Sequence, residues 1–557
     1  MAITTATVIP RGSILNGDVC IVGGGPAGIS AALRIARRSD LRVVVLESGG
    51  LEAEPEAQAL NEGFNDGLDY YDLVETRNRV LGGSSHKWAG WCRPQDPIDF
   101  AGRPWAGSRG WPISYETMVP YFKGAAEMCQ LESEQWSIAS GASLPLLYLP
   151  PFVSGDVEIA LWQGSPPTKF GIAYRDELLA SKQVTVVTEG TATEITTEDG
   201  RATGVLVKSL SGNEFSITAR VTVLAAGGLE TPRLLLASRS QNPLGLGNEN
   251  DNVGRYFAEH PHLVTGRIEV FSREKSGRVT LDALDRGAGG VRARLAMQRP
   301  HGSMKVAYTI SRARQESDGL LNFSTHLRTI STVSREDSDA YQAFKLALGN
   351  LRSPRRFLTQ VRSRSLPDGS GKLLGRLVRG APEIWKVIYQ EALRKPSQLA
   401  LYTQCEQSPN RDSRVTLDDR STDALGVPKL RLNWRLNRTD KESVARAQQI
   451  VGDQLEATGL GRLVAEPFLA EDSDSWGPNL RGGHHQMGTA RMSTDPADGV
   501  VDTDGRVHTV RDLYVADASV FPVAGYANPL FTAVAWALRV ADGLVTHFDE
   551  QAHRGPR

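Results

Sequence analysis

A glycine-rich turn between two apolar segments near the N-terminus constrains the fold more than any other feature of this sequence. Residues 17–50 read GDVCIVGGGPAGISAALRIARRSDLRVVVLESGG. The apolar run 19–22 predicts a buried strand, residues 29–38 have helical spacing, and residues 42–46 predict a second buried strand. Strand, glycine turn, helix and strand in this order predict a Rossmann-type α/β unit.

The turn has the chemistry that a dinucleotide requires. Gly23, Gly25 and Gly28 form a GxGxxG pattern, in which the glycines permit a tight turn, close approach to a pyrophosphate, and packing of helix on strand. Glu47 lies 19 residues after Gly28, where a carboxylate accepts hydrogen bonds from a ribose and would repel a 2′-phosphate. An ordinary α/β turn would explain the glycines but not Glu47, so we predict a dinucleotide site.

The number of such fingerprints bears on which dinucleotide is bound. An enzyme that uses both FAD and NAD usually carries two, and this sequence has one. Segment 221–238, VTVLAAGGLETPRLLLAS, resembles a strand, a turn and a helix but lacks the glycine spacing. A single site at the start of a long chain favours a resident flavin.

Composition excludes several classes of protein. The chain has 557 residues, 40% of them hydrophobic, which is enough for a sizeable core and more than one domain. A formal net charge of -1 argues against a nucleic-acid partner. The four cysteines are scattered, so we expect no disulfide scaffold, no metal site and a reducing compartment. No secretory signal and no apolar run long enough to span a bilayer is found, which predicts a cytoplasmic protein without a membrane partner.

The rest of the chain divides into recognisable parts. Residues 39–47 and 184–224 are rich in strand patterns, and the alternation within 184–195 and 204–210 predicts antiparallel strands. Residues 414–459 predict strands followed by an amphipathic helix, and residues 512–544 predict a strand, a loop and a buried helix. The charged, weakly patterned stretch 272–396 predicts surface insertions in a separate substrate-side region.

Five segments together resemble the glucose–methanol–choline (GMC) oxidoreductases, and within them the bacterial pyranose-oxidase-like branch. They cover about half of the chain in the order typical of that family. The segments are the N-terminal fingerprint, 77–100 with 110–122, 225–238 with 252–262, 406–418, and 482–544.

The resemblance implies an architecture of the p-hydroxybenzoate-hydroxylase type, classed as α/β plus α+β. A Rossmann-type FAD-binding domain would comprise residues 1–95, 184–270 and 480–557. A substrate domain with an antiparallel sheet would comprise residues 96–183 and 271–479. The resemblance also implies FAD as cofactor and oxidation of an alcohol or a sugar.

Oxidation of an alcohol by hydride transfer needs a base for the hydroxyl proton and a donor that steadies the developing alkoxide. The catalytic histidine of the family stands in the pattern H-x-x-G-T, which here begins at His485 rather than His484. The second member of the family's pair aligns with Asn528. We therefore expect His485 and Asn528 to be catalytic, with His484 as the alternative base, and we interpret His260 and His262 as structural.

The resemblance also implies a set of flavin contacts. Some family members attach FAD covalently through a histidine in the loop that follows the glycine pair, but that position holds Lys87, and His86 stands one residue early. We therefore favour non-covalent FAD, with attachment through His86 as the alternative. The expected cofactor-binding residues are Gly23, Gly25, Ala27, Gly28, Glu47, Ser48, Gly83, Ser84, Ser85, Ala192, Asp517, Ala518 and Pro529.

The substrate is the least defined part of the interpretation. Trp88, Trp91, Trp105 and Trp111 fall within 24 residues, and aromatic faces either stack on sugars or fill cores, with core filling favoured for most of them. We expect a sugar, a glycoside or a sugar-like secondary metabolite, with oxygen or another acceptor reoxidising the flavin. The alternatives are a non-sugar primary or secondary alcohol, an NAD(P)H-fed flavin monooxygenase, and a flavin-binding protein without turnover. Sequence leaves the oligomeric state open.

Overall fold

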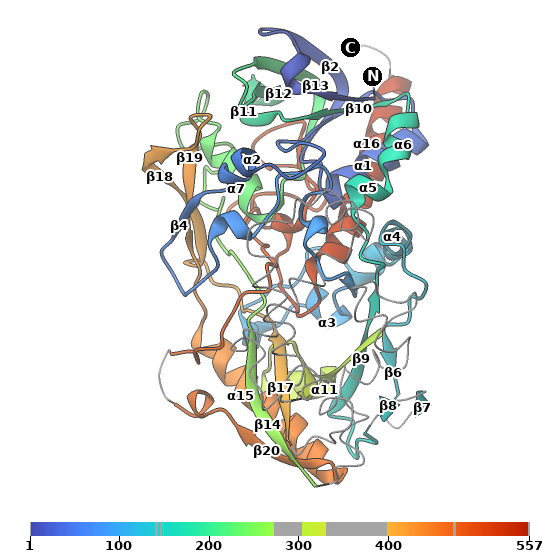
Figure 1. Cartoon of the computed structure of the whole chain (residues 1–557), viewed down its shortest axis with the longest axis vertical. Coiled ribbons are helices and arrows are strands. Elements are labelled where there is room, and N and C mark those ends of the chain that lie inside the picture. Colours follow the sequence, from blue (N-terminus) through green and yellow to red (C-terminus); the bar gives the residue numbers. More distant parts are fainter. Residues whose placement is uncertain are drawn as a thin grey trace, which may run out of the picture.

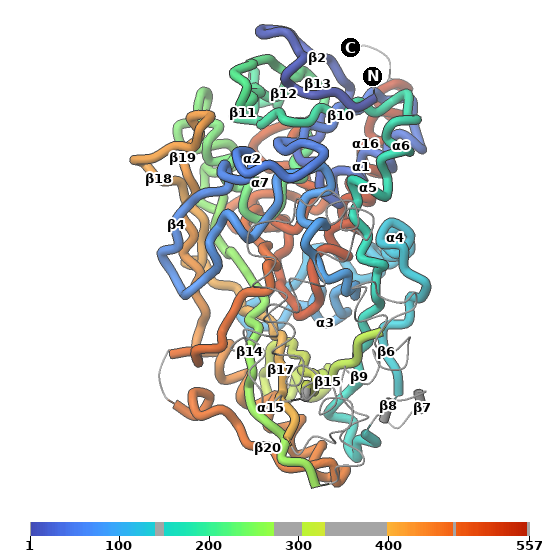
Figure 2. Tube along the Cα trace, in the orientation of Figure 1, coloured from blue at the N-terminus to red at the C-terminus, as the bar shows by residue number. Residues whose placement is uncertain are grey.

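The computed structural model describes residues 2–139, 143–144, 147–148, 150–271, 304–329, 398–471 and 475–554. Two eight-stranded sheets form the framework, one toward each end of the long axis (Figure 1). The chain passes between them repeatedly, and its last third contributes segments at both ends (Figure 2). Residues far apart in the sequence are therefore brought together where the two sheets meet.

The first sheet has the strand order β1-β10-β3-β2-β13-β12-β11, with β21 paired to β13. Its strands are β1 (Ile3–Thr5), β2 (Ile14–Val22), β3 (Val43–Leu46), β10 (Val184–Thr188), β11 (Thr191–Glu198), β12 (Arg201–Lys208), β13 (Glu214–Leu224) and β21 (Leu513–Val515). Helix α1 (Pro26–Arg38) joins β2 to β3, and these two strands pair in parallel. The predicted strand–turn–helix–strand unit is therefore confirmed.

The strands within 184–224 are only partly as predicted. β11, β12 and β13 pair in antiparallel fashion, as the alternation indicates. β10 instead pairs in parallel with both β3 and β1, so the antiparallel prediction is wrong for residues 184–188. The physical reason is burial: four of the five β10 residues are buried, because this strand lies inside the sheet between two parallel neighbours.

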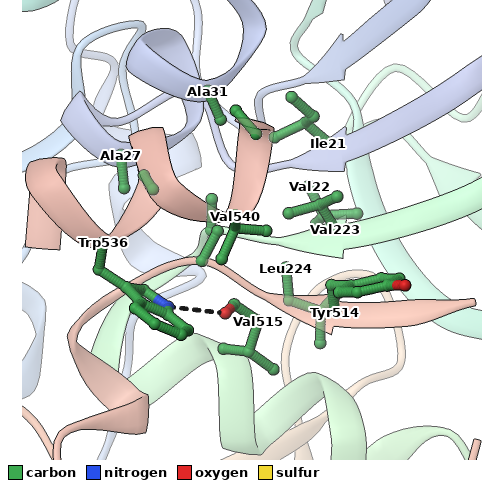
Figure 3. Packing of buried hydrophobic residues seen from close by; sticks show 14 of the residues in the cluster. Ile21, Val22, Ala27, Ala31, Val223, Leu224, Tyr514, Val515, Trp536 and Val540 are labelled. Carbon is green, nitrogen blue, oxygen red and sulfur yellow. Dashed lines mark hydrogen bonds between the residues drawn. The ribbon is translucent and has the colours of Figure 1, made fainter. Parts of the chain in front are cut away.

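Helices α1 and α16 (Pro529–Arg554) cover the first sheet and complete its core. Apolar side chains from both helices meet side chains of β2, β13 and β21 (Figure 3). Trp536 of α16 is fully buried, and its indole nitrogen donates a 3.0 Å hydrogen bond to the backbone oxygen of Val515. The C-terminal strand, loop and buried helix are thus as predicted.

The second sheet has the order β20-β14-β17-β16-β15-β9-β5, with β6 paired to β9, and every pairing in it is antiparallel. Its strands are β5 (Trp91–Cys92), β6 (Ser137–Ile138), β9 (Val157–Gly164), β14 (His262–Val270), β15 (Met304–Ile310), β16 (Phe323–Thr329), β17 (Gln398–Cys405) and β20 (Gly461–Ala465). Helix α15 (Arg438–Ala457) contributes apolar residues to the core of this sheet. The predicted domain division remains a prediction; β5 and β14, which it assigns to the first domain, pair within this second sheet.

The stretch 272–396 is described only at residues 304–329. These residues form β15, helix α11 (Arg312–Asp318) and β16, and both strands lie inside the second sheet. The interpretation of this part as a surface insertion is wrong, because its strands are buried by pairing on both sides. The rest of the stretch lies outside the described residues.

Smaller elements complete the described chain. A three-stranded sheet joins β18 (Arg414–Thr422), β19 (Pro428–Asn433) and β4 (Gly63–Asn65), and β7 (Ser143–Leu144) pairs with β8 (Leu147–Tyr148). The remaining α-helices are α2 (Pro55–Ala59), α3 (Pro97–Phe100), α4 (Tyr115–Met128), α5 (Phe170–Ala173), α6 (Arg175–Ala180) and α7 (Gly227–Ala237). Strands β18 and β19 followed by α15 match the prediction for residues 414–459.

Helix α16 is, among the described residues, the one helix long and apolar enough to cross a bilayer by length and composition. The sequence-based statement that no apolar run reaches this length is therefore wrong on these two criteria. Yet 72% of the most apolar window of this helix is buried inside the protein, as is usual for a core helix.

Candidate active site

The turn between β2 and α1 shows why glycine stands at each position of the fingerprint. Gly23 has φ +111°, and a Cβ there would lie 2.5 Å from the backbone oxygen of Ala225. A Cβ on Gly28 would lie 1.9 Å from the oxygen of Gly23, so this glycine permits the helix to approach the strand. A Cβ on Gly25 would meet no atom within 4 Å, which leaves open space beside the first turn of α1.

Glu47 follows β3 and points back at this turn. Its carboxylate accepts hydrogen bonds from the backbone nitrogens of Gly24 at 2.9 Å and Gly49 at 2.8 Å. Burial raises the pKa of Glu47 to about 7, although these bonds and Arg79 act in the opposite direction. The neighbouring Ser48 accepts a 2.6 Å hydrogen bond from Arg79.

The 3-10 helix η3 (Gly83–His86) lies against the glycine turn. Gly83 has φ +51°, and a Cβ on it would lie 3.1 Å from the Cα of Gly25. Ser85 is buried and serves the loop itself, because its hydroxyl donates to the oxygen of Gly82 and accepts from the nitrogen of Phe170. Ser84 is exposed. The structure thus brings the two glycine-rich loops together.

The remaining expected cofactor contacts surround the same region. Asp517 is buried, and its carboxylate accepts from the nitrogens of Gly227 and Ser519 at 2.8 Å and from the hydroxyl of Thr231 at 2.6 Å. This carboxylate therefore anchors the start of α7. The other members are Ala27 on α1, Ala192 on β11, Ala518 directly after Asp517, and Pro529 at the start of α16.

These residues fit a dinucleotide such as FAD. No side chain lies close to the Cβ position of Gly25, and Gly83 lies beside Gly25. Gly25 directly precedes the 13-residue helix α1, whose N-terminus has no side-chain cap. The run 520–527 is buried, whereas residues 528–530 at the start of α16 are partly exposed. Both the glycine turn at Gly25 and the start of α16 are thus partly exposed.

His485 and Asn528 lie side by side, as the sequence predicts. The side-chain nitrogen Nδ2 of Asn528 is 3.0 Å from Nε2 of His485, although the two residues are 43 positions apart. Both side chains are half-buried, so each keeps a face open to a ligand.

Trp162 of β9 fixes the orientation of the Asn528 amide. Its indole N–H, which can only donate, lies 3.0 Å from Oδ1 of Asn528. The oxygen of the amide therefore faces Trp162, and the NH₂ group faces His485. Since Trp162 is fully buried, this orientation is held by the core of the second sheet.

His260 fixes the protonation pattern of His485 from the other side. Nε2 of His260 lies 3.1 Å from the backbone oxygen of Ala524, which accepts only, so this nitrogen carries the proton. Nδ1 of neutral His260 is then an acceptor, and it lies 2.9 Å from Nδ1 of His485. His485 must donate there, which leaves its Nε2 unprotonated, with a lone pair that accepts from the Asn528 amide.

The pKa values in this cluster favour the neutral rings. Burial lowers the pKa of His260 to about 4. Burial, together with His260, His262, His484 and Lys305, holds the pKa of His485 well below its usual range. A neutral His485 has the lone pair that a general base requires.

His484 is directed elsewhere. Its φ is +57°, and its ring stacks on Tyr71 with centroids 4.1 Å apart. The carboxylate of Glu259 accepts from the backbone nitrogens of Gly483 and His485, both at 2.6 Å, and from the hydroxyl of Tyr70 at 2.8 Å. This anchored loop turns His485, and not His484, toward Asn528.

Three residues that sequence analysis set aside or missed lie against the pair. His260, interpreted as structural, contacts His485 directly, and the ring of His262 lies edge-on to His485 with centroids 5.5 Å apart. Trp162 has no sequence signal beyond its place in an apolar strand. For His260, its position in the segment 252–262 that resembles the family is the signal that could have drawn attention to it.

The four tryptophans of residues 88–111 divide into two kinds. Trp111 is buried and stacks on Phe100 with centroids 5.2 Å apart, so it fills the core. Trp88 and Trp91 are half-buried and pack against the buried cores, and Trp105 is half-buried, so core packing describes most of the set as predicted. Trp88 and Trp105 donate their indole N–H to backbone oxygens at 3.0 Å.

Comparison with protein families identifies the class. Residues 173–262 and 409–537 match the two GMC oxidoreductase models, N-terminal and C-terminal, and residues 2–50 match the Thi4 family model. The chain thus carries the N and C domains of a GMC oxidoreductase, with a Rossmann-type FAD-binding region and a substrate region built on an antiparallel sheet. It is an FAD-dependent oxidoreductase that oxidises a hydroxyl group of a small substrate and passes the electrons to an acceptor.

Individual relatives are distant. The chain is 24% identical to 2-methyl-1,2-propanediol dehydrogenase of Mycolicibacterium austroafricanum, over 96% of both chains. It is 26% identical to C-glycoside 3-oxidase of Arthrobacter globiformis, over 68% of this chain and 56% of that protein. Among solved structures, pyridoxine 4-oxidase from Mesorbium loti superposes with a TM-score of 0.58 at 16% identity, over 95% of this chain and 99% of the other, which shows a shared fold.

Proposed function

We propose that His485 is the base that takes the substrate hydroxyl proton and that Asn528 steadies the oxygen as its charge develops. The observation that carries this assignment is the 3.0 Å contact between Nδ2 of Asn528 and the unprotonated Nε2 of His485. A substrate oxygen placed between them would donate its proton to His485 and accept from the Asn528 amide. The buried donors and acceptors behind both side chains hold them in place before substrate arrives.

Bound FAD supplies the acceptor for the hydride that leaves the substrate carbon bearing the hydroxyl group. Gly23, Gly25 and Gly28 would hold its pyrophosphate at the start of α1, with Glu47 at the ribose. The other expected contacts are Ala27, Ser48, Gly83, Ser84, Ser85, Ala192, Asp517, Ala518 and Pro529. In this chain the hydroxyl proton moves to His485, and the closed packing behind Asn528 keeps water from competing with the substrate oxygen.

We infer that the FAD is non-covalent. Nε2 of His86 lies 2.9 Å from the backbone oxygen of Leu81, so this nitrogen is engaged within its own loop. Acid precipitation of the purified protein should leave a yellow supernatant. A yellow pellet that becomes colourless in a His86→Ala variant would establish attachment through His86 instead.

We propose a sugar, a glycoside or a sugar-like metabolite as the substrate, in a cytoplasmic enzyme that uses oxygen or another acceptor. The similarity to C-glycoside 3-oxidase supports this class. The second candidate is a non-sugar alcohol. The similarity to 2-methyl-1,2-propanediol dehydrogenase, which extends over 96% of both chains, favours this class.

An anaerobic absorbance scan against sugars, glycosides, diols and simple alcohols separates these candidates. Bleaching by sugars or glycosides at lower concentration than by diols supports the first class, and the reverse order supports the second. Bleaching by NADPH alone would replace both with a flavin monooxygenase.

A further inference from the structure

His260 lies behind His485, away from the side that faces Asn528, and has no exposed surface. Its ring is held between two fixed groups, with Nε2 3.1 Å from the oxygen of Ala524 and Nδ1 2.9 Å from Nδ1 of His485. The side-chain nitrogen of Gln404 lies 3.4 Å from the same Nδ1, and it also donates to the backbone oxygen of Tyr526. Of these partners, Ala524, Gln404 and Tyr526 are buried, and His485 is half-buried.

We propose that His260 is a positioning residue that sets the tautomer of His485 and so exposes the lone pair used for proton abstraction. This inference rests on the proposed role of His485 as the base. His260 does not touch the reacting atoms. It acts through the single hydrogen bond between the two Nδ1 atoms.

The direction of each hydrogen bond follows from the chemistry of its ends. The Ala524 oxygen accepts only, and therefore Nε2 of His260 donates. Nδ1 of the neutral ring then accepts, and His485 supplies the proton from its own Nδ1. The other nitrogen of His485, Nε2, is left unprotonated, and its lone pair faces the Asn528 amide and the position of the substrate oxygen.

The same bond gains strength during the reaction. When Nε2 of His485 takes the hydroxyl proton, one O–H bond breaks and one N–H bond forms, and the ring becomes positively charged. Its Nδ1–H is then a charged donor to His260, and charge-assisted hydrogen bonds are stronger than neutral ones. His260 thus stabilises the protonated base without taking up a proton itself.

Other charged or titratable groups around His485 must be considered in any pH profile. His262, His484 and Lys305 lower the pKa of His485, and His260 does so only when its own ring is charged, which its pKa of about 4 excludes between pH 6 and 9. The Glu259 carboxylate accepts from the backbone nitrogen of His485. Variants at position 260 leave His262, His484, Lys305 and Glu259 in place.

Two substitutions separate this role from mere packing. In His260→Leu no acceptor faces His485. In His260→Asn the amide oxygen takes the place of Nδ1, and the Gln404 side-chain nitrogen favours that orientation because it donates to the same point. Both variants are to be purified with FAD, and anaerobic stopped-flow reduction by the best substrate is to be followed from pH 6 to 9.

We expect His260→Leu to reduce its flavin roughly 10–100-fold more slowly, the range typical of residues that orient a functional histidine from behind. Its substrate dissociation constant should stay within about twofold of wild type, and its pH profile should shift, since the tautomer is now free. His260→Asn should recover most of the lost rate. Nitrogen-15 NMR of histidine-labelled protein, assigned with His485→Gln, should show the proton on Nδ1 in wild type and His260→Asn, and a mixture of tautomers in His260→Leu.

A wild-type rate and pH profile in His260→Leu would overturn the proposal, as would a His485 proton on Nε2 in the wild-type protein. If the leucine variant does not fold, His260→Asn decides: a slow variant that keeps FAD and still shows the Nδ1 proton contradicts the tautomer role. The His485→Ala variant distinguishes failure of the base assignment from failure of the positioning role. A normal rate in His485→Ala removes His485 as the base. A slow His485→Ala together with a normal His260→Leu removes only the role of His260.

Discussion

Replacing Trp162 by Phe tests how strongly the orientation of the Asn528 amide matters. The substitution removes the indole N–H that lies 3.0 Å from Oδ1 of Asn528 and keeps an aromatic ring in the core. Without this donor the amide is free to rotate and to place its oxygen against the lone pair of His485. In that orientation Asn528 no longer donates to the substrate oxygen.

The expected magnitude follows from the lost bond. A buried neutral hydrogen bond contributes about 0.5–1.5 kcal/mol net, and this is the bias that Trp162 adds to the correct amide orientation. Since about 1.4 kcal/mol corresponds to a factor of ten in rate, the flavin should be reduced roughly 2–10-fold more slowly. Substrate affinity should change less, because the bond to the substrate oxygen strengthens as charge develops.

Trp536→Phe is the matched control for this experiment. Trp536 is also fully buried and donates a single 3.0 Å hydrogen bond, but to the backbone oxygen of Val515 in the first sheet. Both variants lose the same atoms, so both should lose similar thermal stability. Single-turnover anaerobic reduction, measured by stopped flow, should be slowed only in Trp162→Phe. Equal rates in the two variants would refute the view that Trp162 orients Asn528.

Three further predictions concern the cofactor turn and the loop that carries His485. Gly25→Ala should weaken FAD binding at nearly unchanged apoprotein stability, because the added Cβ enters the open space beside the turn. Gly28→Ala should fail to fold, because its Cβ would lie 1.9 Å from the Gly23 oxygen. FAD titration and circular dichroism distinguish the two outcomes. Glu259→Gln replaces a carboxylate that accepts from two backbone N–H groups, so the free energy of unfolding should fall by roughly 1–3 kcal/mol and flavin reduction should slow. An unchanged melting temperature and an unchanged reduction rate would contradict the anchoring role of Glu259. Burial raises the pKa of Glu47 from 4.5 to about 7, so the contribution of Glu47 to apoprotein stability is complete below about pH 4.5 and is lost as pH rises through 7. Between pH 5 and 8 the melting temperature should therefore fall less steeply in Glu47→Gln than in wild type. Parallel slopes would contradict the shift.

Local sequence patterns were sufficient for the cofactor half of the fold. The strand, turn and helix around Gly23, Gly25 and Gly28 depend on residues within a few positions of one another, and the structure has them as predicted. β10 differs because its parallel pairing with β1 and β3 depends on partners about 180 and 140 residues away, respectively, which alternation alone does not reveal. Likewise, the polar character of the stretch around β15 and β16 concealed two strands of the second sheet.

The site shows the same division between local and distant information. His485 and Asn528 could be chosen because the motifs that contain them resemble those of a known family, and the structure places them 3.0 Å apart. The groups that orient them could not be chosen from sequence. Trp162 lies 366 positions from Asn528, and His260 lies 225 positions from His485, so only the fold shows which tautomer and which amide orientation the pair adopts.

Single-turnover reduction of the His485→Ala variant tests the central assignment most directly. The variant should bind FAD with the wild-type absorbance spectrum, since His485 lies among none of the expected cofactor contacts. Its flavin should be reduced about 10²–10⁴-fold more slowly than in wild type by the same substrate under anaerobic conditions, because general-base help is lost. A reduction rate within a few-fold of wild type at neutral pH would contradict the assignment of His485 as the base.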